Sequence, residues 1–296
     1  MFGGSLVAIV TPMKKDGAID YKSFENLVDW HLENSTDGLV VLGSTGEAPT
    51  ITFPERTKIL RKIIDQVNKK IPVLVGTGSN STSHTIDLTQ HAMESGASAA
   101  LIVTPYYNKP SQEGLFQHFK AISEAVPTFA QVLYNIPSRT ACDLLPQTVL
   151  RLEKCCPNIV GIKEATGDVK RVKQLLQGTN RLDLFSGDDD TAVDFILSGG
   201  KGAISVMANI FPKQWHNLCT LAASGKTKFT KKCSENLLPL RKLLFIESNP
   251  IPVKWVLAQT GVIPEGIRLP LTSFSERYHN EMREAMKRAG IKRLID

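Results

Sequence analysis

Cysteine is scarce in this sequence, and the few cysteines have no spacing that indicates a disulfide framework or a zinc site. There are five, an odd number with no CxxC pair: Cys142, Cys155, Cys156, Cys219 and Cys233. Free thiols are typical of a reducing compartment, so we expect a cytoplasmic protein.

Long apolar runs are also missing. The longest, such as Ala99–Val103, fall far short of the ~20 residues that span a bilayer. The stretch Met1–Thr11 has no basic residue before its apolar part, which leads directly into a strand-like pattern. We therefore expect no signal peptide and no membrane partner.

A surface patch of one charge sign is missing as well. Lys and Arg number 35 against 29 Asp and Glu, a formal charge of 35 − 29 = +6. Basic residues alternate with acidic ones in helical segments, as in Glu55–Lys58. The densest basic cluster, Lys226–Lys232, is typical of an exposed helix. We expect no nucleic-acid partner.

What is present is a regular alternation of short apolar runs with amphipathic segments. The runs are Leu6–Val10, Gly38–Leu42, Pro72–Gly76, Ala99–Val103, Ala130–Tyr134, Ile159–Lys163, Leu182–Ser186 and Gly202–Val206. Such runs are typical of parallel strands buried on both faces. The apolar faces of predicted helices lie between them: Phe24, Leu27, Val28 and His31; Ile59, Leu60, Ile63 and Ile64; Val172, Leu175 and Leu176.

This order predicts an α/β fold, a (β/α)8 TIM barrel, rather than a doubly wound sheet. No GxGxxG motif follows the first run, which argues against dinucleotide binding. Residues 225–296 contain helical patterns at Asn236–Phe245, Pro252–Gln259 and Phe274–Arg288. We therefore predict a catalytic barrel over 1–224 and a small C-terminal helical domain over 225–296, packed on the barrel as an appendage.

Lys163 is the most informative residue at a predicted strand end, which is where barrels of this class place their active sites. Because side chains alternate along a strand, we expect Val160 and Ile162 to face the helices. Gly161 and Lys163 would then face the barrel axis, with Gly161 leaving space beneath the lysine. The amine would lose hydration there, which favours the neutral form that attacks a ketone to give an imine. A strand-end lysine that reaches back to water is the alternative, and the residues alone leave both open.

Three other strand-end residues have two interpretations each. The Tyr134 hydroxyl could move protons, or the ring could fill the barrel. Thr45, in a Gly-Ser-Thr-Gly turn, could hold a carboxylate, or the turn could be purely structural. Arg139 could bind a substrate carboxylate in a bidentate manner, or form a salt bridge within its loop.

The acidic run Asp188–Asp190 raises the question of a metal, because hard cations prefer oxygen ligands. Capping of the helix expected to begin near Thr191 is the favoured interpretation. All six histidines fall in predicted helices and none at a strand end: His31, His84, His91, His118, His216 and His279. We therefore expect a metal-independent reaction.

Four ordered motifs carry a resemblance to a known family. They are Gly43-Ser44-Thr45-Gly46-Glu47, Tyr106-Tyr107, Tyr134-Asn135-Ile136-Pro137-Ser138-Arg139-Thr140 and Gly161-Ile162-Lys163-Glu164. Together they resemble the pyruvate-dependent, class I aldolase-type lyases of the dihydrodipicolinate synthase and N-acetylneuraminate lyase family, over nearly the whole chain.

The resemblance implies a set of site residues. Lys163 would form a Schiff base with pyruvate, with no further cofactor. Thr45, Tyr134 and Tyr107 would relay protons, Tyr107 coming from a neighbouring subunit. Ser44 and Thr45 would hold the pyruvate carboxylate, with backbone groups near Gly187 and Ile204 lining the pocket. These roles are implied by the resemblance.

Arg139 would, by the same resemblance, bind the carboxylate of aspartate semialdehyde. The implied reaction is condensation of pyruvate with L-aspartate 4-semialdehyde to 4-hydroxy-tetrahydrodipicolinate, the first committed step of diaminopimelate and lysine biosynthesis. A retro-aldol lyase of a sugar acid and a non-catalytic ligand-binding barrel are the alternatives, and Arg139 favours the condensation. A homotetramer, a dimer of dimers, is implied, although some relatives are dimers.

The regulatory lysine pocket of the resembled family departs from its usual pattern here. The corresponding positions are Ala48, Phe53, Arg56, Asn80, His84 and Tyr106. A glutamate is typical where this chain has His84, and a histidine where it has Phe53. An ammonium ligand would lack a carboxylate partner and would meet Arg56, so we expect feedback inhibition by lysine to be weak or absent.

Overall fold

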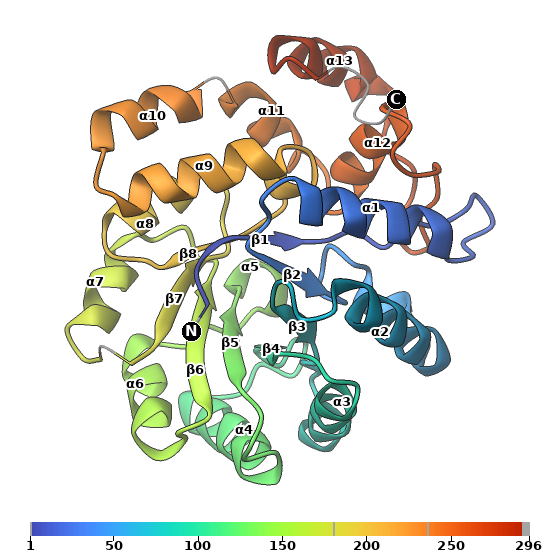
Figure 1. The fold of residues 1–296 in the computed structure, drawn as a ribbon. Helices are drawn as coiled ribbons and strands as arrows, with labels where there is room; N and C mark the ends of the chain where they lie inside the picture. Colours follow the sequence, from blue (N-terminus) through green and yellow to red (C-terminus); the bar gives the residue numbers. More distant parts are fainter. Residues whose placement is uncertain (1, 180, 236, 292–296) are drawn as a thin grey trace.

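The computed structural model describes residues 2–179, 181–235 and 237–291. Its centre is a closed barrel of eight parallel strands in sequential order, with β8 pairing to β1 (Figure 1). The strands are β1 (Gly4–Ala8), β2 (Gly38–Val41), β3 (Val73–Gly76), β4 (Ala99–Val103), β5 (Gln131–Asn135), β6 (Ile159–Glu164), β7 (Asp183–Ser186) and β8 (Gly202–Ser205). The predicted TIM barrel is confirmed.

The helices follow the strands and form an outer layer around them (Figure 1). Those of the barrel are α1 (Tyr21–Glu33), η1 (Ala48–Thr50), α2 (Phe53–Val67), α3 (Thr82–Glu94), α4 (Gln112–Ala125), α5 (Pro137–Thr140), α6 (Pro146–Cys155), α7 (Lys170–Leu176), α8 (Ala192–Leu197), η2 (Met207–Asn209) and α9 (Pro212–Ala223). All six histidines lie in helices, as predicted. Within the described ranges, no helix is both long and apolar enough to cross a membrane.

Two hydrophobic layers hold the barrel together, one inside the sheet and one between the sheet and the helices. The inner layer comprises Leu6, Ala8, Val40, Leu74, Ala99, Leu101, Val132, Tyr134, Phe185 and Ile204. Their neighbours along the strands, such as Val7 and Val41, pack against the helices. Burial on both faces is the reason the strands appear as unbroken apolar runs.

The first strand is the one that departs most from prediction, because it ends at Ala8 rather than Val10. The backbone N–H of Val10 donates to Asn209 Oδ1 at 3.1 Å, so the chain leaves the ladder there to meet η2. The other predicted strands agree with the structure to within one residue at each end.

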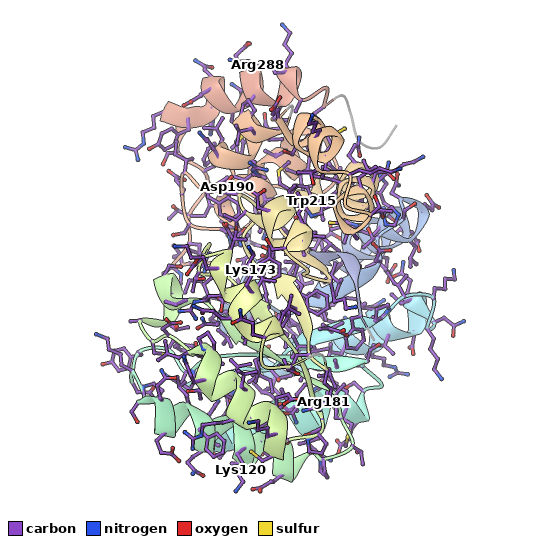
Figure 2. All side chains as sticks on the ribbon, turned by 90° about the vertical axis from the view of Figure 1, so that its left-hand side faces the viewer. Lys120, Lys173, Arg181, Asp190, Trp215 and Arg288 are labelled. Atoms are coloured by element: carbon purple, nitrogen blue, oxygen red, sulfur yellow. The ribbon has the colours of Figure 1, made fainter. Side chains whose placement is uncertain are left out.

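The predicted helix faces are confirmed with one exception. Phe24, Leu27, Val28 and His31 are the buried residues of α1. Leu176 was expected on the apolar face of α7, but 40% of it is exposed. It is the last residue of a short helix, and only Val172 and Leu175 reach the core. Charged residues such as Lys173 and Arg288, which Figure 2 labels, are exposed, whereas Trp215 of α9 is fully buried.

The C-terminal segment is helical, as predicted. It contains α10 (Thr227–Glu235), α11 (Leu238–Leu243), α12 (Ile251–Gln259), η3 (Glu276–Tyr278) and α13 (His279–Arg288). Residue 236, where one helix was expected to begin, lies outside the described residues. Ser275 is extended, so the last helical stretch starts at Glu276 rather than Phe274. The division of the chain at residues 224 and 225 stays a prediction.

Candidate active site

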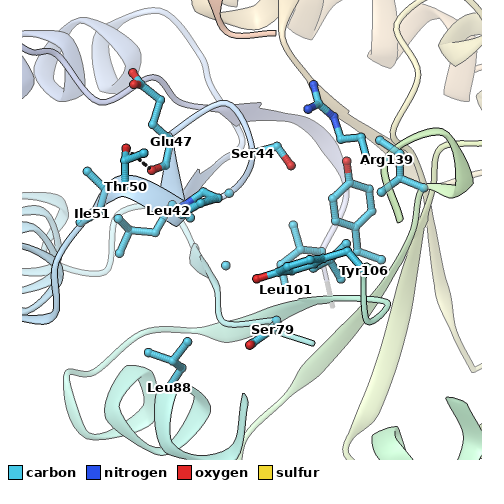
Figure 3. A pocket seen from close by; sticks show the side chains of 18 of the residues that line it. Leu42, Ser44, Glu47, Thr50, Ile51, Ser79, Leu88, Leu101, Tyr106 and Arg139 are labelled. Carbon is cyan, nitrogen blue, oxygen red and sulfur yellow. Dashed lines mark hydrogen bonds between the residues drawn. The ribbon is translucent and has the colours of Figure 1, made fainter. Parts of the chain in front are cut away.

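A pocket of about 560 Å³ opens at the C-terminal ends of the strands (Figure 3). Its walls come from the segments after β2, β3, β4 and β5, and also from the C-terminal segment: Leu42, Gly43, Ser44, Glu47, Ala48, Pro49, Thr50, Ile51, Phe53, Arg56, Gly76, Gly78, Ser79, His84, Leu88, Leu101, Val103, Tyr106, Tyr134, Ile136, Arg139, Thr140, Ser248, Asn249, Pro270 and Leu271. The C-terminal segment, predicted as a helical appendage of the barrel, thus also supplies part of the pocket wall.

Lys163 faces the barrel interior, as strand alternation predicted. It stands in register with Tyr134 of β5 and Phe185 of β7, both members of the inner layer. Its Nζ lies 4.3 Å from the centroid of the Tyr134 ring, and only 6% of the residue is exposed. Within the described part of the chain, no carboxylate pairs with this amine. A buried amine with no counter-charge is suited to nucleophilic chemistry.

The glycine that makes room for this lysine is Gly187, not Gly161. A Cβ at Gly187 would lie 2.7 Å from Lys163 Cε and 2.9 Å from Cγ. A Cβ at Gly161 would instead lie 2.5 Å from the carbonyl oxygen of Asp183. Gly161 thus serves the close approach of β6 to β7, and the sequence-based prediction was wrong on this point.

Val160 was also placed wrongly. The register between β5 and β6 shifts between Gln131 and Val132, which pair with Ile159 and Gly161. This irregularity turns Val160 toward the inner layer, against which it packs, instead of toward the helices. Ile162 lies in the outer core, as predicted, because alternation resumes beyond the shift.

Ser44, Tyr134 and Arg139 line the pocket together (Figure 3 labels Ser44 and Arg139). Arg139 lies on the short helix α5, and its Nη2 donates to the carbonyl oxygen of Asn249 at 3.1 Å. Among the described residues it forms no salt bridge, so the alternative of a loop salt bridge is not what the structure shows. Its remaining N–H groups are available to a ligand.

Thr45 is buried just behind the pocket wall, and its hydroxyl oxygen accepts a hydrogen bond of 2.9 Å from Asn249 Nδ2. Asn249 thereby contacts both Thr45 and Arg139, and it lines the pocket itself. Sequence reasoning missed this residue. It precedes a proline in the C-terminal segment, far from any strand end, and no pattern in the sequence marks it.

Glu47 fixes the turn that carries Ser44 and Thr45. Its carboxylate forms an ion pair with Lys254 of α12, and both residues are almost completely buried. Burial lowers the pKa of Lys254, and the neighbouring Glu47 partly offsets that effect. A second oxygen of Glu47 accepts from the backbone N–H of Arg268 at 3.2 Å. The turn is thus bound to the C-terminal segment at two points.

Glu164 and Asn135 hold the ends of β6 and β5. The Asn135 side chain donates to Glu164 at 3.2 Å and to Asp143 at 2.8 Å, and it accepts from the backbone of Leu144. Burial raises the pKa of Glu164, while hydrogen bonds from Asn135 and the charge of Arg171 oppose the rise. These contacts position the strand that carries Lys163.

The three acidic residues of Asp188–Asp190 go to three different partners. Asp188 accepts from the backbone N–H of Thr191 at 3.1 Å, which is the turn before α8. Asp189 accepts from the backbone N–H groups of Val206 and Met207 at 3.0 and 2.8 Å. Asp190 pairs with Arg241. Helix capping was expected of the run as a whole, but Asp188 alone serves that turn.

The other predicted site residues fall into three groups. Gly187 lies beside Lys163, and Ile204 is buried in the inner layer below the pocket. Tyr107 is 89% exposed with φ of 74°, and it does not line the pocket of its own chain.

Five positions of the expected regulatory pocket line the same pocket as Ser44: Ala48, Phe53, Arg56, His84 and Tyr106. Asn80 does not; its carbonyl oxygen accepts from Asn108.

The closed barrel of eight parallel strands, with a lysine buried near the C-terminal end of β6, defines the class of protein, a TIM barrel. A family model described as the dihydrodipicolinate synthetase family matches residues 1–289. The chain is 66% identical over 292 residues to the 4-hydroxy-tetrahydrodipicolinate synthase of Coxiella burnetii, covering 99% of this chain and 100% of that protein. The chain belongs to the dihydrodipicolinate synthetase family.

Other relatives agree with this assignment. The 4-hydroxy-tetrahydrodipicolinate synthase of Nitrosococcus oceani is 52% identical, covering 98% of this chain and 99% of that protein. The crystal structure of the chloride-inhibited dihydrodipicolinate synthase from Acinetobacter baumannii, complexed with pyruvate, superposes with a TM-score of 0.96 at 51% identity, covering 99% of this chain and 100% of that one. A monomeric dihydrodipicolinate synthase variant superposes with a TM-score of 0.94 at 43% identity, covering 98% of this chain and 97% of that one.

Proposed function

We propose that this chain condenses pyruvate with L-aspartate 4-semialdehyde to 4-hydroxy-tetrahydrodipicolinate through an imine on Lys163. The activity is that of a lyase, and the names of its relatives support it at high identity over the full chain. The observation that carries the proposal is the Lys163 amine, which is buried at a strand end without a carboxylate partner.

The chemistry follows from that amine. Lys163 Nζ attacks the keto carbon of pyruvate, and loss of one water molecule leaves the imine. Removal of a methyl proton gives the enamine, whose carbon attacks the aldehyde of aspartate semialdehyde and forms the new carbon–carbon bond. The Tyr134 ring lies beside the amine, with its centroid 4.3 Å from Lys163 Nζ, and we assign its hydroxyl as the first proton carrier, followed by Thr45 and by Tyr107 of a neighbouring copy.

Charge and hydroxyl groups around the pocket suit two acidic substrates. Ser44 and Thr45 would donate to the pyruvate carboxylate, and backbone groups near Gly187 and Ile204 would complete its site. Arg139, with unpaired N–H groups, would bind the carboxylate of aspartate semialdehyde. The Asn249 contacts hold Thr45 and Arg139 in place for this.

The two alternatives are not favoured. A retro-aldol lyase of a sugar acid would have no use for Arg139 in this position, and the relatives carry the synthase name. A non-catalytic barrel would leave the unpaired lysine unexplained, because buried charges are otherwise paired. The reaction would begin diaminopimelate and lysine biosynthesis in the cytoplasm, with a homotetramer bringing Tyr107 to a neighbouring site, and it would need no cofactor or metal.

Borohydride trapping tests the proposal. Reduction of the protein in the presence of pyruvate, followed by peptide mass mapping, should give one pyruvate-derived adduct on Lys163. Lys163→Arg keeps the charge but removes the nucleophile, so that variant should give no adduct. An adduct elsewhere, or none on the wild-type protein, contradicts the mechanism. Turnover with N-acetylneuraminate but not with aspartate semialdehyde contradicts the substrate assignment.

A further inference from the structure

The Thr45 hydroxyl accepts a hydrogen bond from the protein but keeps its own hydrogen for another partner. Asn249 Nδ2 donates to Thr45 Oγ1 at 2.9 Å. Within the described part of the chain the Thr45 hydroxyl donates to no acceptor, although the residue is only 4% exposed. A hydroxyl has one hydrogen to donate and two lone pairs that accept. Because the amide N–H occupies one lone pair, the hydrogen of Thr45 is directed away from Asn249.

The Asn249 amide makes this contact while its other end stays without a partner. Its Oδ1 is buried and forms no hydrogen bond with the described residues. A buried acceptor without a partner is destabilising, and such groups are few in native proteins. Turning the amide over would bring Oδ1 to Thr45 and reverse the direction of the hydrogen bond. The observed orientation is the one that leaves the Thr45 hydrogen free.

Asn249 contacts the residues assigned to the two substrates through different groups. Its side chain reaches Thr45, whereas its backbone carbonyl oxygen accepts from Arg139 Nη2 at 3.1 Å. Asn249 lines the pocket together with Ser44 and Arg139, which Figure 3 labels. A substitution of the Asn249 side chain leaves the carbonyl group in place. Its effect on Thr45 can therefore be measured separately from any effect on Arg139.

We propose that Asn249 is a positioning residue that makes Thr45 a fixed hydrogen-bond donor to the carboxylate of pyruvate. The inference rests on the proposed function, in which Ser44 and Thr45 hold that carboxylate. A carboxylate only accepts hydrogen bonds, so it binds a hydroxyl whose hydrogen points toward it and not one whose hydrogen is turned toward the protein. The Asn249 side chain thus determines the affinity for pyruvate and not the affinity for aspartate semialdehyde.

Asn249→Asp tests the direction of this hydrogen bond with little change in shape. An ionised carboxyl group cannot donate, so the Thr45 hydroxyl should donate to it instead of to pyruvate. Borohydride trapping over a series of pyruvate concentrations gives the concentration at which half of Lys163 carries the adduct. That concentration should rise roughly tenfold to a hundredfold, the usual effect of losing a hydrogen bond to a charged group. Asn280→Asp, exposed on α13, adds the same charge and should behave as wild type.

Thr45→Val supplies the background that separates orientation of the hydroxyl from a general effect on the site. In the otherwise wild-type chain, Asn249→Ala removes the donor without adding a charge and should raise the half-saturating pyruvate concentration by about threefold to tenfold. In the Thr45→Val background Asn249→Ala should raise it no further, because no hydroxyl is left to orient, and Asn249→Asp should lose most of its effect. This comparison also keeps the test valid if Asn249→Asp fails to fold, since Asn249→Ala buries no new charge.

The KM for aspartate semialdehyde, measured at saturating pyruvate, should equal the wild-type value in the Asn249 variants, because the carbonyl group that holds Arg139 remains. The inference is overturned if Asn249→Asp needs no more pyruvate than wild type, or if the effects of Asn249→Ala and Thr45→Val multiply independently. It is also overturned if the KM for aspartate semialdehyde rises as much as the half-saturating pyruvate concentration. In these cases wild-type protein still forms the adduct. No adduct on wild-type Lys163 would instead contradict the proposed function, and this inference with it.

Discussion

Gly187 and Lys163 are in such close contact that the missing side chain of one determines the position of the other. A Cβ at Gly187 would come within 2.7 Å of Lys163 Cε and equally close to the Cβ of Ala165. The lysine side chain is the flexible one of these two neighbours, whereas the Cβ of Ala165 can move only together with its backbone. The space next to Gly187, directly after β7, is thus occupied by the Lys163 side chain.

Gly187→Ala should therefore slow the reaction strongly and also lower the thermal stability of the protein, because Ala165 cannot move aside without its backbone. Displacing a reacting group by about 1 Å costs on the order of a hundredfold in rate, and we expect a fall in kcat of that order. Steady-state kinetics together with a thermal melt would measure both effects. Gly43→Ala is the control for folding, because no atom lies near a Cβ added at that position. Gly225, after α9, also has open space around it, but its φ of 72° would strain an alanine. Unchanged kcat in Gly187→Ala would contradict the contact.

Arg139→Met should raise the KM for aspartate semialdehyde. A charge-assisted hydrogen bond contributes about 1.5–3 kcal/mol, so kcat/KM for that substrate should fall by roughly tenfold to a hundredfold. Trapping of pyruvate on Lys163 should be unaffected, because Arg139 serves the second substrate. Arg61→Met, on the exposed face of α2, is the matched control and should behave as wild type. Equal loss of pyruvate trapping would place Arg139 at the first substrate instead.

Lysine should inhibit the protein weakly or not at all. The pocket positions Phe53, Arg56 and His84 offer a lysine ammonium no free carboxylate, and Arg56 repels it. An initial-rate assay with increasing L-lysine at subsaturating pyruvate would measure this. Strong inhibition at low lysine concentration would show that another acceptor completes the site.

The buried carboxyl of Asp189 should make stability depend on pH. Burial raises its pKa from 3.8 to about 6. Because the folded-state pKa exceeds the unfolded one, the stabilising contribution of this group is complete below about pH 4 and is lost as the pH rises through 6. Asp189→Asn keeps an acceptor for Val206 and Met207 but cannot ionise.

Relative to wild type, the free energy of unfolding of Asp189→Asn should therefore rise by about 2 kcal/mol between pH 4 and pH 7. Urea unfolding of both proteins at the two pH values gives this difference directly, and groups that titrate alike in both cancel. If the free energies of unfolding of the two proteins differ by the same amount at both pH values, Asp189 does not cause the pH dependence of stability.

Lys254→Met should be strongly destabilising, because it leaves the Glu47 carboxylate buried without its partner. Breaking one side of a buried pair costs about 3–5 kcal/mol. The double variant Lys254→Met, Glu47→Gln removes the stranded charge as well and should recover part of that loss. Chemical denaturation of the wild type, the single variant and the double variant would measure it. If the single variant loses only ~0.5 kcal/mol in its free energy of unfolding, the Glu47–Lys254 pair contributes no more than a surface ion pair, which contradicts the prediction.

Local periodicity was sufficient to predict the barrel and the inward direction of Lys163. Alternation of side chains is a property of one strand and needs no knowledge of its neighbours. The misplacement of Val160 has the opposite cause, since the register shift exists only between β5 and β6. The same holds for Gly187, whose importance depends on how closely β7 approaches the lysine on β6.

Contacts distant along the chain were beyond prediction from residues alone. Asn249 donates a hydrogen bond to Thr45, which lies 204 positions earlier in the chain. No sequence pattern near Asn249 indicates that its side chain lines a pocket. The burial of Arg56 is similar, because an arginine in an amphipathic helix is usually solvated, and only the tertiary structure brings its Nη1 to the Gly76 carbonyl oxygen at the end of β3. The resemblance to the family named Arg56 as a pocket position without indicating its burial, and it did not identify Asn249.

The hydrogen bond between Asn249 and Thr45 has a consequence for the order in which the protein is made. Thr45 leaves the ribosome early, and all eight strands precede Asn249 along the chain. All eight strands of the barrel are thus synthesised before the segment that carries Ser248, Asn249 and Lys254, and a barrel made of those strands alone would be incomplete. Its Glu47 carboxylate then has no lysine to pair with, and its pocket lacks one wall. Synthesis of the last part of the chain completes the binding pocket as well as the fold.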